Sequence, residues 1–118
     1  MRRKHHNLNA WKLSIQLVKE VYRVTGSFPN SEAFGLVSQM RRAAVSVPSN
    51  IAEGAARSSS KEFSHFLGIA RGSLSELETQ IAISKELGYL SDSEALDELV
   101  DRVFGLIGGL VKAIRARS

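Results

Sequence analysis

The segment MRRAAVSVPSNIAEGAARSSSKEF, residues 40–63, determines the fold. Apolar side chains recur at steps of three and four on both sides of a proline, at Met40, Ala44, Val47, Ile51 and Ala55. A polar series keeps phase in the same way, at Arg42, Ser46, Asn50, Glu53 and Arg57. Such steps place side chains on one face of an α-helix. The segment therefore predicts one helix, kinked where Pro48 removes a backbone hydrogen bond, rather than two short helices.

Working outward, this helix starts after a cap at Asn30 or Ser31 and continues to about Arg57. The serines at 58–60 then interrupt the helical pattern. Ser59 and Glu62 have the spacing of a capping box, which predicts a third helix that ends near 87, before Gly88. Its core face carries Phe63, Leu67, Ala70, Leu74, Leu77 and Ile81.

Two further helices flank this pair. The first is predicted over residues 10–25, between a cap at Asn9 and a left-handed Gly26. The last follows a capping box at Ser91 and Glu94. Its apolar stripe is Leu96, Leu99, Val103, Leu106, Leu110 and Ile114. Because the connections are short, the sequence predicts an all-α, antiparallel up-down-up-down four-helix bundle over residues 10–118, preceded by a basic arm over residues 1–9.

Composition narrows the class of protein. The 118 residues include no cysteine, which excludes disulfides, thiolate metal sites and cysteine nucleophiles. No apolar run approaches the ~18 residues of a membrane span, and no secretory signal follows the basic start. We therefore expect a cytoplasmic protein with no membrane partner.

The first helix has more apolar surface than one bundle buries. One face carries Trp11, Ile15, Val18 and Tyr22, and a second face beside it carries Ala10, Leu13, Leu17, Val21 and Val24. A monomer would leave part of this surface in water, which indicates self-association. The glycine pairs Gly68/Gly72 and Gly105/Gly109 predict close backbone approach within the bundle or between subunits; simple tolerance of glycine is the alternative.

Antiparallel pairing brings two polar stripes face to face. When the second helix is reflected onto the third about the serine turn, Arg42 lies level with Glu76. We expect a partly buried structural network around that ion pair, made by Arg42, Ser46, Asn50, Ser73, Glu76 and Gln80. We expect such a network to fix the register of the two helices rather than to take part in catalysis.

A catalytic site is not indicated. Glu62 and His65 match the Glu-x-x-His fragment of di-iron bundles, but a second fragment needs another histidine on a helix, and His5 and His6 lie in the arm. The serine turn before Lys61 offers free amides and hydroxyls to an anion, or is simply a capped turn. We therefore predict no enzyme activity, no metal and no cofactor.

Charge is strongly polarised in the predicted bundle, although the net charge is only +4. Both chain ends and the serine turn meet at one end, where nine cations face two carboxylates. The opposite end is acidic. The residues predicted to contact nucleic-acid phosphates are Arg2, Arg3, Lys4, Arg57, Lys61, Lys112, Arg115 and Arg117. We expect no base-specific recognition, because aromatic side chains for stacking are lacking there; basic tails that only aid solubility are the alternative.

Two long motifs resemble a known bacterial family. They are FGLVSQMRRAAVSVPSNIAEG, residues 34–54, and IARGSLSELETQ, residues 69–80. The chain is similar, from Trp11 to the last helix, to the four-helix-bundle proteins named for intervening sequences in 23S ribosomal RNA genes. That family also includes the accessory protein of diversity-generating retroelements.

The resemblance implies a homopentameric ring of four-helix protomers. In the retroelement accessory proteins it implies association with a reverse transcriptase and with nucleic acid through a basic surface. The family positions that carry over are Arg41, Arg42 and Arg57. We therefore expect a non-catalytic oligomeric module that binds RNA or DNA phosphates through its basic end. The alternative is a protein-interaction scaffold that partners a nucleic-acid enzyme and binds no nucleic acid itself.

Overall fold

Four long helices and two short 3-10 turns make up residues 3–117, the part of the chain that the computed structural model describes. In chain order the elements are η1 (Lys4–Asn7), α1 (Asn9–Thr25), η2 (Asn30–Glu32), α2 (Leu36–Ala55), α3 (Ser60–Glu86) and α4 (Glu94–Arg117). Residues 3–117 contain no β-strand, so the predicted all-α class is confirmed.

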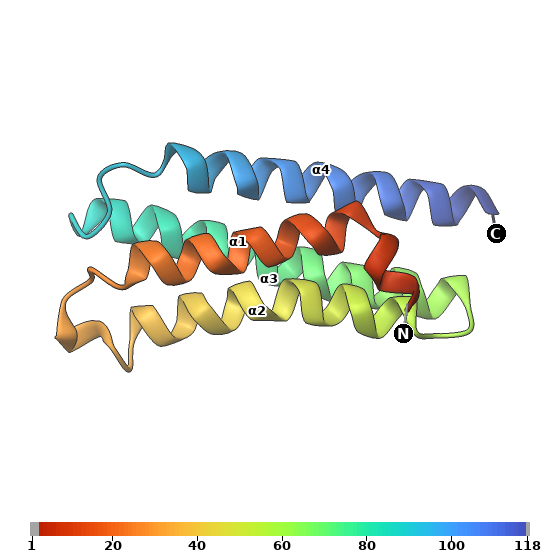
Figure 1. The fold of residues 1–118 in the computed structure, drawn as a ribbon, viewed down its shortest axis with the longest axis horizontal. Helices are drawn as coiled ribbons and strands as arrows, with labels where there is room; N and C mark the ends of the chain where they lie inside the picture. The colour runs from red at the N-terminus through yellow and green to blue at the C-terminus, as the bar shows by residue number, and fades with distance from the viewer. Residues whose placement is uncertain (1–2, 118) are drawn as a thin grey trace.

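The helices lie along one long axis and pack as a four-sided bundle of 46 × 24 × 21 Å (Figure 1). Each helix lies beside its neighbour in sequence, and α1 also lies beside α4, whereas the diagonal pairs α1–α3 and α2–α4 have no Cα atoms within 8 Å of each other among the described residues. Side-chain contacts between α2 and α3 occur in opposite order along the two helices. Met40 Sδ lies 3.4 Å from Ser84 Oγ, and Ser46 Oγ lies 2.8 Å from Ser73 Oγ.

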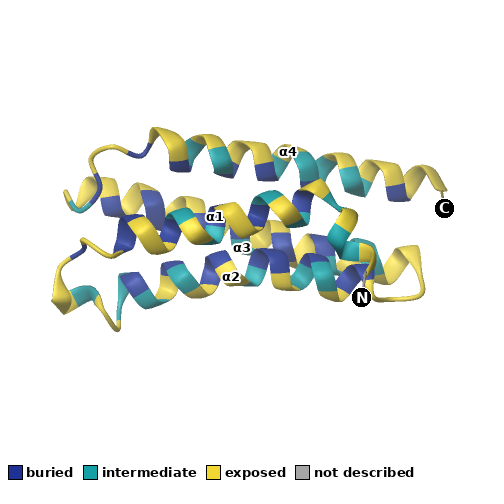
Figure 2. Cartoon of the chain, viewed as in Figure 1, coloured by how far each residue is buried: buried dark blue, intermediate teal, exposed yellow. Residues whose placement is uncertain are grey.

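The core is formed by one buried stripe from each helix (Figure 2). The predicted core residues of α2 are all buried, as are those of α3 except the half-buried Phe63. On α4 the prediction is wrong in part. Leu99, Leu106 and Leu110 are only half-buried, because Val100 and Ile107 point to the core instead. Together with Leu96, Val103 and Ile114 they follow the tighter stripe of a bundle seam.

Both predicted ends of α3 are confirmed. Ser59 Oγ accepts a hydrogen bond of 3.1 Å from the Glu62 amide and thereby caps the first turn. At the other end Gly88 has a φ of 78°, a left-handed conformation that costs glycine little. The Tyr89 amide then bonds to the Ser84 carbonyl at 2.9 Å, which satisfies a carbonyl of the last turn.

Two predicted features of α1 are wrong. Asn9 is its first residue rather than its cap, since the extended residue before it is Leu8 and no side chain caps the helix. Gly26 ends the helix with a φ of −62°, in the right-handed region. The Thr25 hydroxyl instead stabilises this end of the helix, because it donates a hydrogen bond of 2.7 Å to the Val21 carbonyl.

The predicted starts of α2 and α4 are also wrong. The capping residues Asn30 and Ser31 belong to the short turn η2, and α2 starts only after Gly35, which has a φ of −108° and a ψ of −110°. The last helix starts at Glu94 itself, so Glu94 is not the third residue of a turn capped by Ser91.

Pro48 lies buried inside one continuous helix, so α2 is a single helix rather than two short ones. Its ring takes part in the inner face of the bundle between Val47 and the half-buried Asn50. The kink expected at this position stays a prediction.

Candidate nucleic-acid interface

One end of the bundle collects the predicted phosphate-binding residues. η1, the start of α1, the α2–α3 turn and the end of α4 lie toward this end (Figure 1). The exposed cations that these segments contribute are Arg3, Lys4, Lys12, Arg57, Lys61, Lys112, Arg115 and Arg117. The predicted contact Arg2 lies outside the described residues. We call the set of eight exposed cations the basic end.

Arg57, a member of the basic end, is held by carboxylates. Its guanidinium lies 2.8 Å from Glu53 and 3.9 Å from Glu62, and it also stacks 4.8 Å from the centre of the Phe66 ring. Arg57 therefore connects the end of α2 to the start of α3, and its charge is largely offset.

Five other long side chains of the basic end have no such partner among the residues that the structure describes. Among residues 3–117, the side chains of Lys4, Lys61, Lys112, Arg115 and Arg117 make no ion pair within 4.0 Å. These exposed charges are available to an anion from solution. They also stand on three different segments, η1, α3 and α4, which spreads them over the width of the end rather than along one helix.

The serine turn does not form a separate anion site. Ser59 Oγ accepts from the Glu62 amide and lies 3.2 Å from the Glu62 carboxylate. That carboxylate also lies near Arg57. The turn hydroxyl and the nearby cation thus already have the Glu62 carboxylate as a partner, which favours the capped-turn alternative.

Aromatic rings do lie at this end, contrary to the sequence-based expectation, but they are covered. Trp11 is half-buried, with the rings of His5 and His6 at 4.9 and 5.5 Å between ring centres. Phe66 lies beneath Arg57. Both rings are half-buried and already have partners, so neither is a freely exposed platform for a base.

The histidine contacts were missed by sequence reasoning. Residues 1–9 were predicted only as a basic arm, yet η1 packs against both α1 and α2. In the sequence His5 and His6 lie only a few residues before Trp11, the single tryptophan, and this short separation could have predicted the contact. Its consequence is that Lys4 is held close to the end of α2 instead of extending freely into solvent.

The opposite end is acidic and contains interhelical pairs. Lys85 on α3 bonds to Asp97 on α4 at 2.8 Å, and Ser93 also donates to Asp97 at 2.9 Å. Burial alone raises the pKa of Asp97, but the hydrogen bonds from Lys85 and Ser93 outweigh it and leave the pKa below its ordinary value. The Tyr89 hydroxyl donates to Glu32 at 3.1 Å, and this bond raises the tyrosine pKa.

The predicted polar network between α2 and α3 forms only in part. Ser46 bonds to Ser73 at 2.8 Å, and the Asn50 amide donates to the Ser46 carbonyl and hydroxyl at 2.8 and 2.9 Å. The central ion pair is wrong: within the described residues Arg42 makes no ion pair with Glu76, and both side chains are exposed.

The rest of that network lies further along α3. Gln80 Nε2 approaches Glu76 at 3.5 Å, and Gln80 is buried. Arg42 and Glu76 line the same shallow groove without meeting. Two long, exposed side chains lose conformational entropy when they pair, and solvent screens what they would gain.

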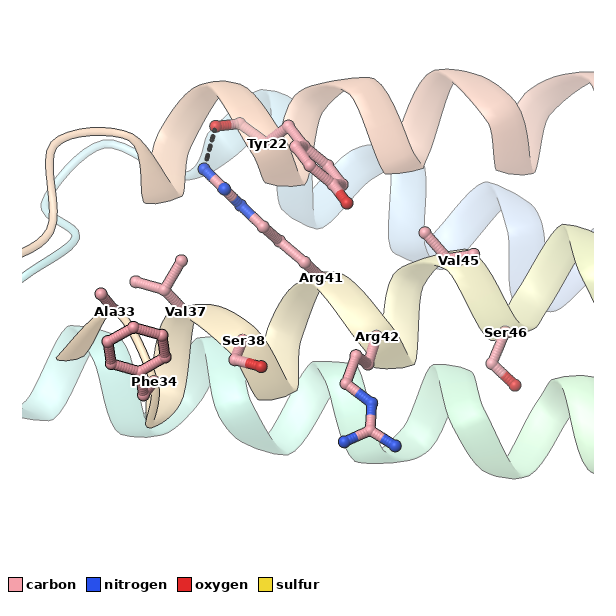
Figure 3. A pocket seen from close by; sticks show the side chains of 9 residues that line it. All are labelled: Tyr22, Ala33, Phe34, Val37, Ser38, Arg41, Arg42, Val45 and Ser46. Atoms are coloured by element: carbon pink, nitrogen blue, oxygen red, sulfur yellow. Dashed lines mark hydrogen bonds between the residues drawn. The ribbon is translucent and has the colours of Figure 1, made fainter.

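Arg41, the other family arginine of this region, fixes α1 to α2. It donates to the Thr25 hydroxyl at 3.0 Å and to the Tyr22 carbonyl at 3.4 Å, and its guanidinium stacks 4.4 Å from the Tyr22 ring centre (Figure 3). Its role in this chain is therefore structural.

The glycine pairs do not mark close approach inside the protomer. A methyl group built on Gly68, Gly72, Gly105 or Gly109 would meet nothing within 4 Å. The glycine that does lie against a neighbouring helix is Gly54 on α2, where a methyl carbon would lie 2.8 Å from Phe66 Cβ on α3.

Residues 3–117 contain no group of three or more His, Cys, Asp or Glu side chains arranged to hold a metal ion. None of their helices combines the length and the apolar character needed to cross a bilayer.

Comparison with known proteins identifies the family. The model of the family described as 23S rRNA-intervening sequence protein matches residues 6–109, most of the chain. The chain belongs to this family. The match begins within η1, includes the whole of α1, α2 and α3, and ends within α4. A comparison with curated proteins found no match.

Proposed function

We propose that this member of the 23S rRNA-intervening sequence protein family is a non-catalytic, cytoplasmic, oligomeric module that binds RNA or DNA phosphates through its basic end. The observation that carries the proposal is a group of exposed cations from three segments that make no ion pair among the described residues: Lys4, Lys61, Lys112, Arg115 and Arg117. Such a group attracts any phosphate backbone, and binding releases condensed counterions.

Base recognition is not part of the proposal. The aromatic rings nearest to the basic end are covered by His5, His6 and Arg57. Contacts limited to phosphates position a nucleic acid without reading its sequence. We therefore expect similar affinity for strands of different sequence.

Oligomerisation strengthens this weak contact. We propose a ring, five-membered as the family resemblance implies, in which several basic ends act on one nucleic acid and raise the avidity. The proposal also takes the helices to alternate in direction and α2 to bend at Pro48. The opposite order of contacts along α2 and α3 supports the alternation.

A gel-shift titration across salt concentrations tests the phosphate contact. We expect the Arg115→Glu/Arg117→Glu double variant to bind about tenfold more weakly or worse than the wild type. The matched control is Lys19→Glu/Arg102→Glu, which changes the net charge equally but alters exposed residues away from the basic end. Equal weakening by both double variants would show that net charge alone, rather than this end, attracts the nucleic acid.

The second candidate is a protein-interaction scaffold without nucleic-acid binding. The exposed apolar side chains on α1, α2 and α3 favour it, because they suit a protein surface better than a phosphate backbone. Undetectable binding of nucleic acid in dilute salt would select the scaffold and overturn the phosphate-binding proposal.

A further inference from the structure

A short turn before α1 lies against the single tryptophan of the chain. We call residues 3–8, which are η1 with one residue on either side, the histidine turn. The ring centres of His5 and His6 lie 4.4 Å apart, and they lie 4.9 and 5.5 Å from the ring centre of Trp11. The turn lies against α1 and α2 (Figure 1), and Leu8 packs against the core. The turn therefore contributes to the half-burial of Trp11.

One hydrogen bond inside the histidine turn depends on the protonation state of His6. The Arg3 amide donates to Nδ1 of His6 at 2.9 Å, and the His6 amide donates to the Arg3 carbonyl at 3.1 Å. Because a backbone amide can only donate, Nδ1 must offer a lone pair and carry no proton. An imidazolium has an N–H at both nitrogens, so it would set two donors against each other. The observed conformation therefore requires a neutral His6.

The charges around the two rings also disfavour a protonated turn. Arg3 and Lys4 belong to the turn itself. On the elements that pack against it, the charged side chains toward this end are Lys12 on α1, Glu53 on α2 and Arg57 just after α2. The Glu53 carboxylate is already paired with Arg57 at 2.8 Å. The surroundings are thus mainly cationic, and like charges destabilise an added imidazolium.

We propose that the histidine turn is a proton-sensitive switch on the basic end. At pH 8 both histidines are neutral and the turn is closed over Trp11. Because the closed turn binds fewer protons than the open one, a falling pH favours the open turn. Opening breaks the bond between His6 and the Arg3 amide, and it adds up to two imidazolium charges beside Lys4.

The consequence is that binding to phosphates strengthens in mild acid. This regulation rests on the proposed function and adds a control to the same site. For single strands each phosphate contact contributes about 0.7 to the slope of log affinity against log salt concentration, which is a factor of about five per contact at 0.1 M salt. We therefore expect the affinity for oligo(dT) to rise about fivefold if one imidazolium contacts a phosphate, and about 25-fold if both do.

Acrylamide quenching of Trp11 fluorescence follows the turn without any nucleic acid, because the chain has a single tryptophan. As the pH falls from 8 to 5.5, we expect the quenching constant of the wild type to rise, with a midpoint at or below about pH 6.5. His65→Gln is the matched control, since it removes an exposed histidine on α3 and should leave this transition unchanged.

His6→Gln is the decisive variant. A glutamine at the third position of the turn can accept the same backbone hydrogen bond, as in a capping box, but it does not titrate. Its quenching constant should stay low at both pH values, whereas His6→Ala, which has no acceptor, should give a high value at both. Circular dichroism checks that the helices are intact. A wild type that shows no transition, a transition that persists in His6→Gln, or a closed turn in His6→Ala at pH 8 would overturn the inference.

The polarisation of labelled oligo(dT), whose bases do not titrate between pH 5.5 and 8, separates the switch from the phosphate-binding proposal. His65→Gln should keep the rise in affinity on acidification, and His5→Gln/His6→Gln should lose it. An equal rise in His5→Gln/His6→Gln would overturn the proposed regulation. Undetectable binding at both pH values would remove the phosphate-binding proposal, and the quenching result would still decide whether the histidine turn opens.

Discussion

A methyl group added at Gly54 tests the packing of α2 against α3. In Gly54→Ala the new carbon would lie 2.8 Å from Phe66 Cβ, 3.0 Å from Phe63 Cδ1 and 3.3 Å from the Phe63 carbonyl oxygen. Two of these three atoms are backbone or are bonded directly to it, so they cannot rotate away. The end of α2 and the first turns of α3 must therefore separate by several tenths of an ångström.

The magnitude follows from two opposing effects. Overpacking of this kind costs about 1–3 kcal/mol, whereas alanine is favoured over glycine in a helix by up to about 1 kcal/mol. We expect a net loss of about 1–2 kcal/mol, which for a chain of this size lowers Tm by about 3–10 °C. The glycine's position near the end of α2 keeps the helix-propensity gain below its full value.

The assay is thermal unfolding followed by circular dichroism at one fixed protein concentration, since self-association makes Tm depend on concentration. The matched control is Gly105→Ala on α4, where the added carbon meets nothing within 4 Å. Relief of glycine's conformational entropy should raise its Tm by about 2–5 °C. A Gly54→Ala protein as stable as the Gly105→Ala protein would refute the close contact between α2 and α3.

Other substitutions test separate contacts by the same unfolding assay. Ser73→Ala removes the hydrogen bond to Ser46 and should cost about 1 kcal/mol; an unchanged Tm would mean that this bond is not formed in solution. Because folding lowers the pKa of Asp97, its carboxylate stabilises the protein above its unfolded pKa of about 3.9, and this contribution disappears as the pH falls through the folded value. Asp97→Asn should therefore be less stable than the wild type at pH 7 and lose less stability between pH 5 and 3; parallel Tm–pH curves would argue against the Lys85–Asp97 contact.

Helix number and core faces could be predicted because they depend on side-chain period. The stripe from Met40 to Ala55 kept its phase across Pro48, and the structure has one helix there. The capped start of α3 and the left-handed Gly88 also depend on a few adjacent residues. Where a helix start depends on a longer turn, as at η2 before α2, the prediction fails: the expected cap, Asn30 or Ser31, lies five or four residues before the observed N-cap, Gly35.

The candidate site was less predictable. Reflecting one helix onto another predicts the position of a residue along the bundle axis, but not the direction in which its side chain points around the helix. Arg42 and Glu76 are level, as predicted, yet they line the groove without pairing. The contact of Gly54 with Phe66 depends on how closely the helices approach, and no sequence period encodes that distance. The clustering of cations was easier to predict, because it depends only on the end of the bundle at which each charged segment lies.

The salt dependence of nucleic-acid affinity tests the central claim most directly. For duplex DNA each phosphate contact contributes about 0.9 to the slope of log affinity against log salt concentration. We expect a steep negative slope for the wild type, and a slope shallower by about 1.8 or more for Arg115→Glu/Arg117→Glu. A slope near zero, or one that the double substitution leaves unchanged, would contradict phosphate binding by the basic end.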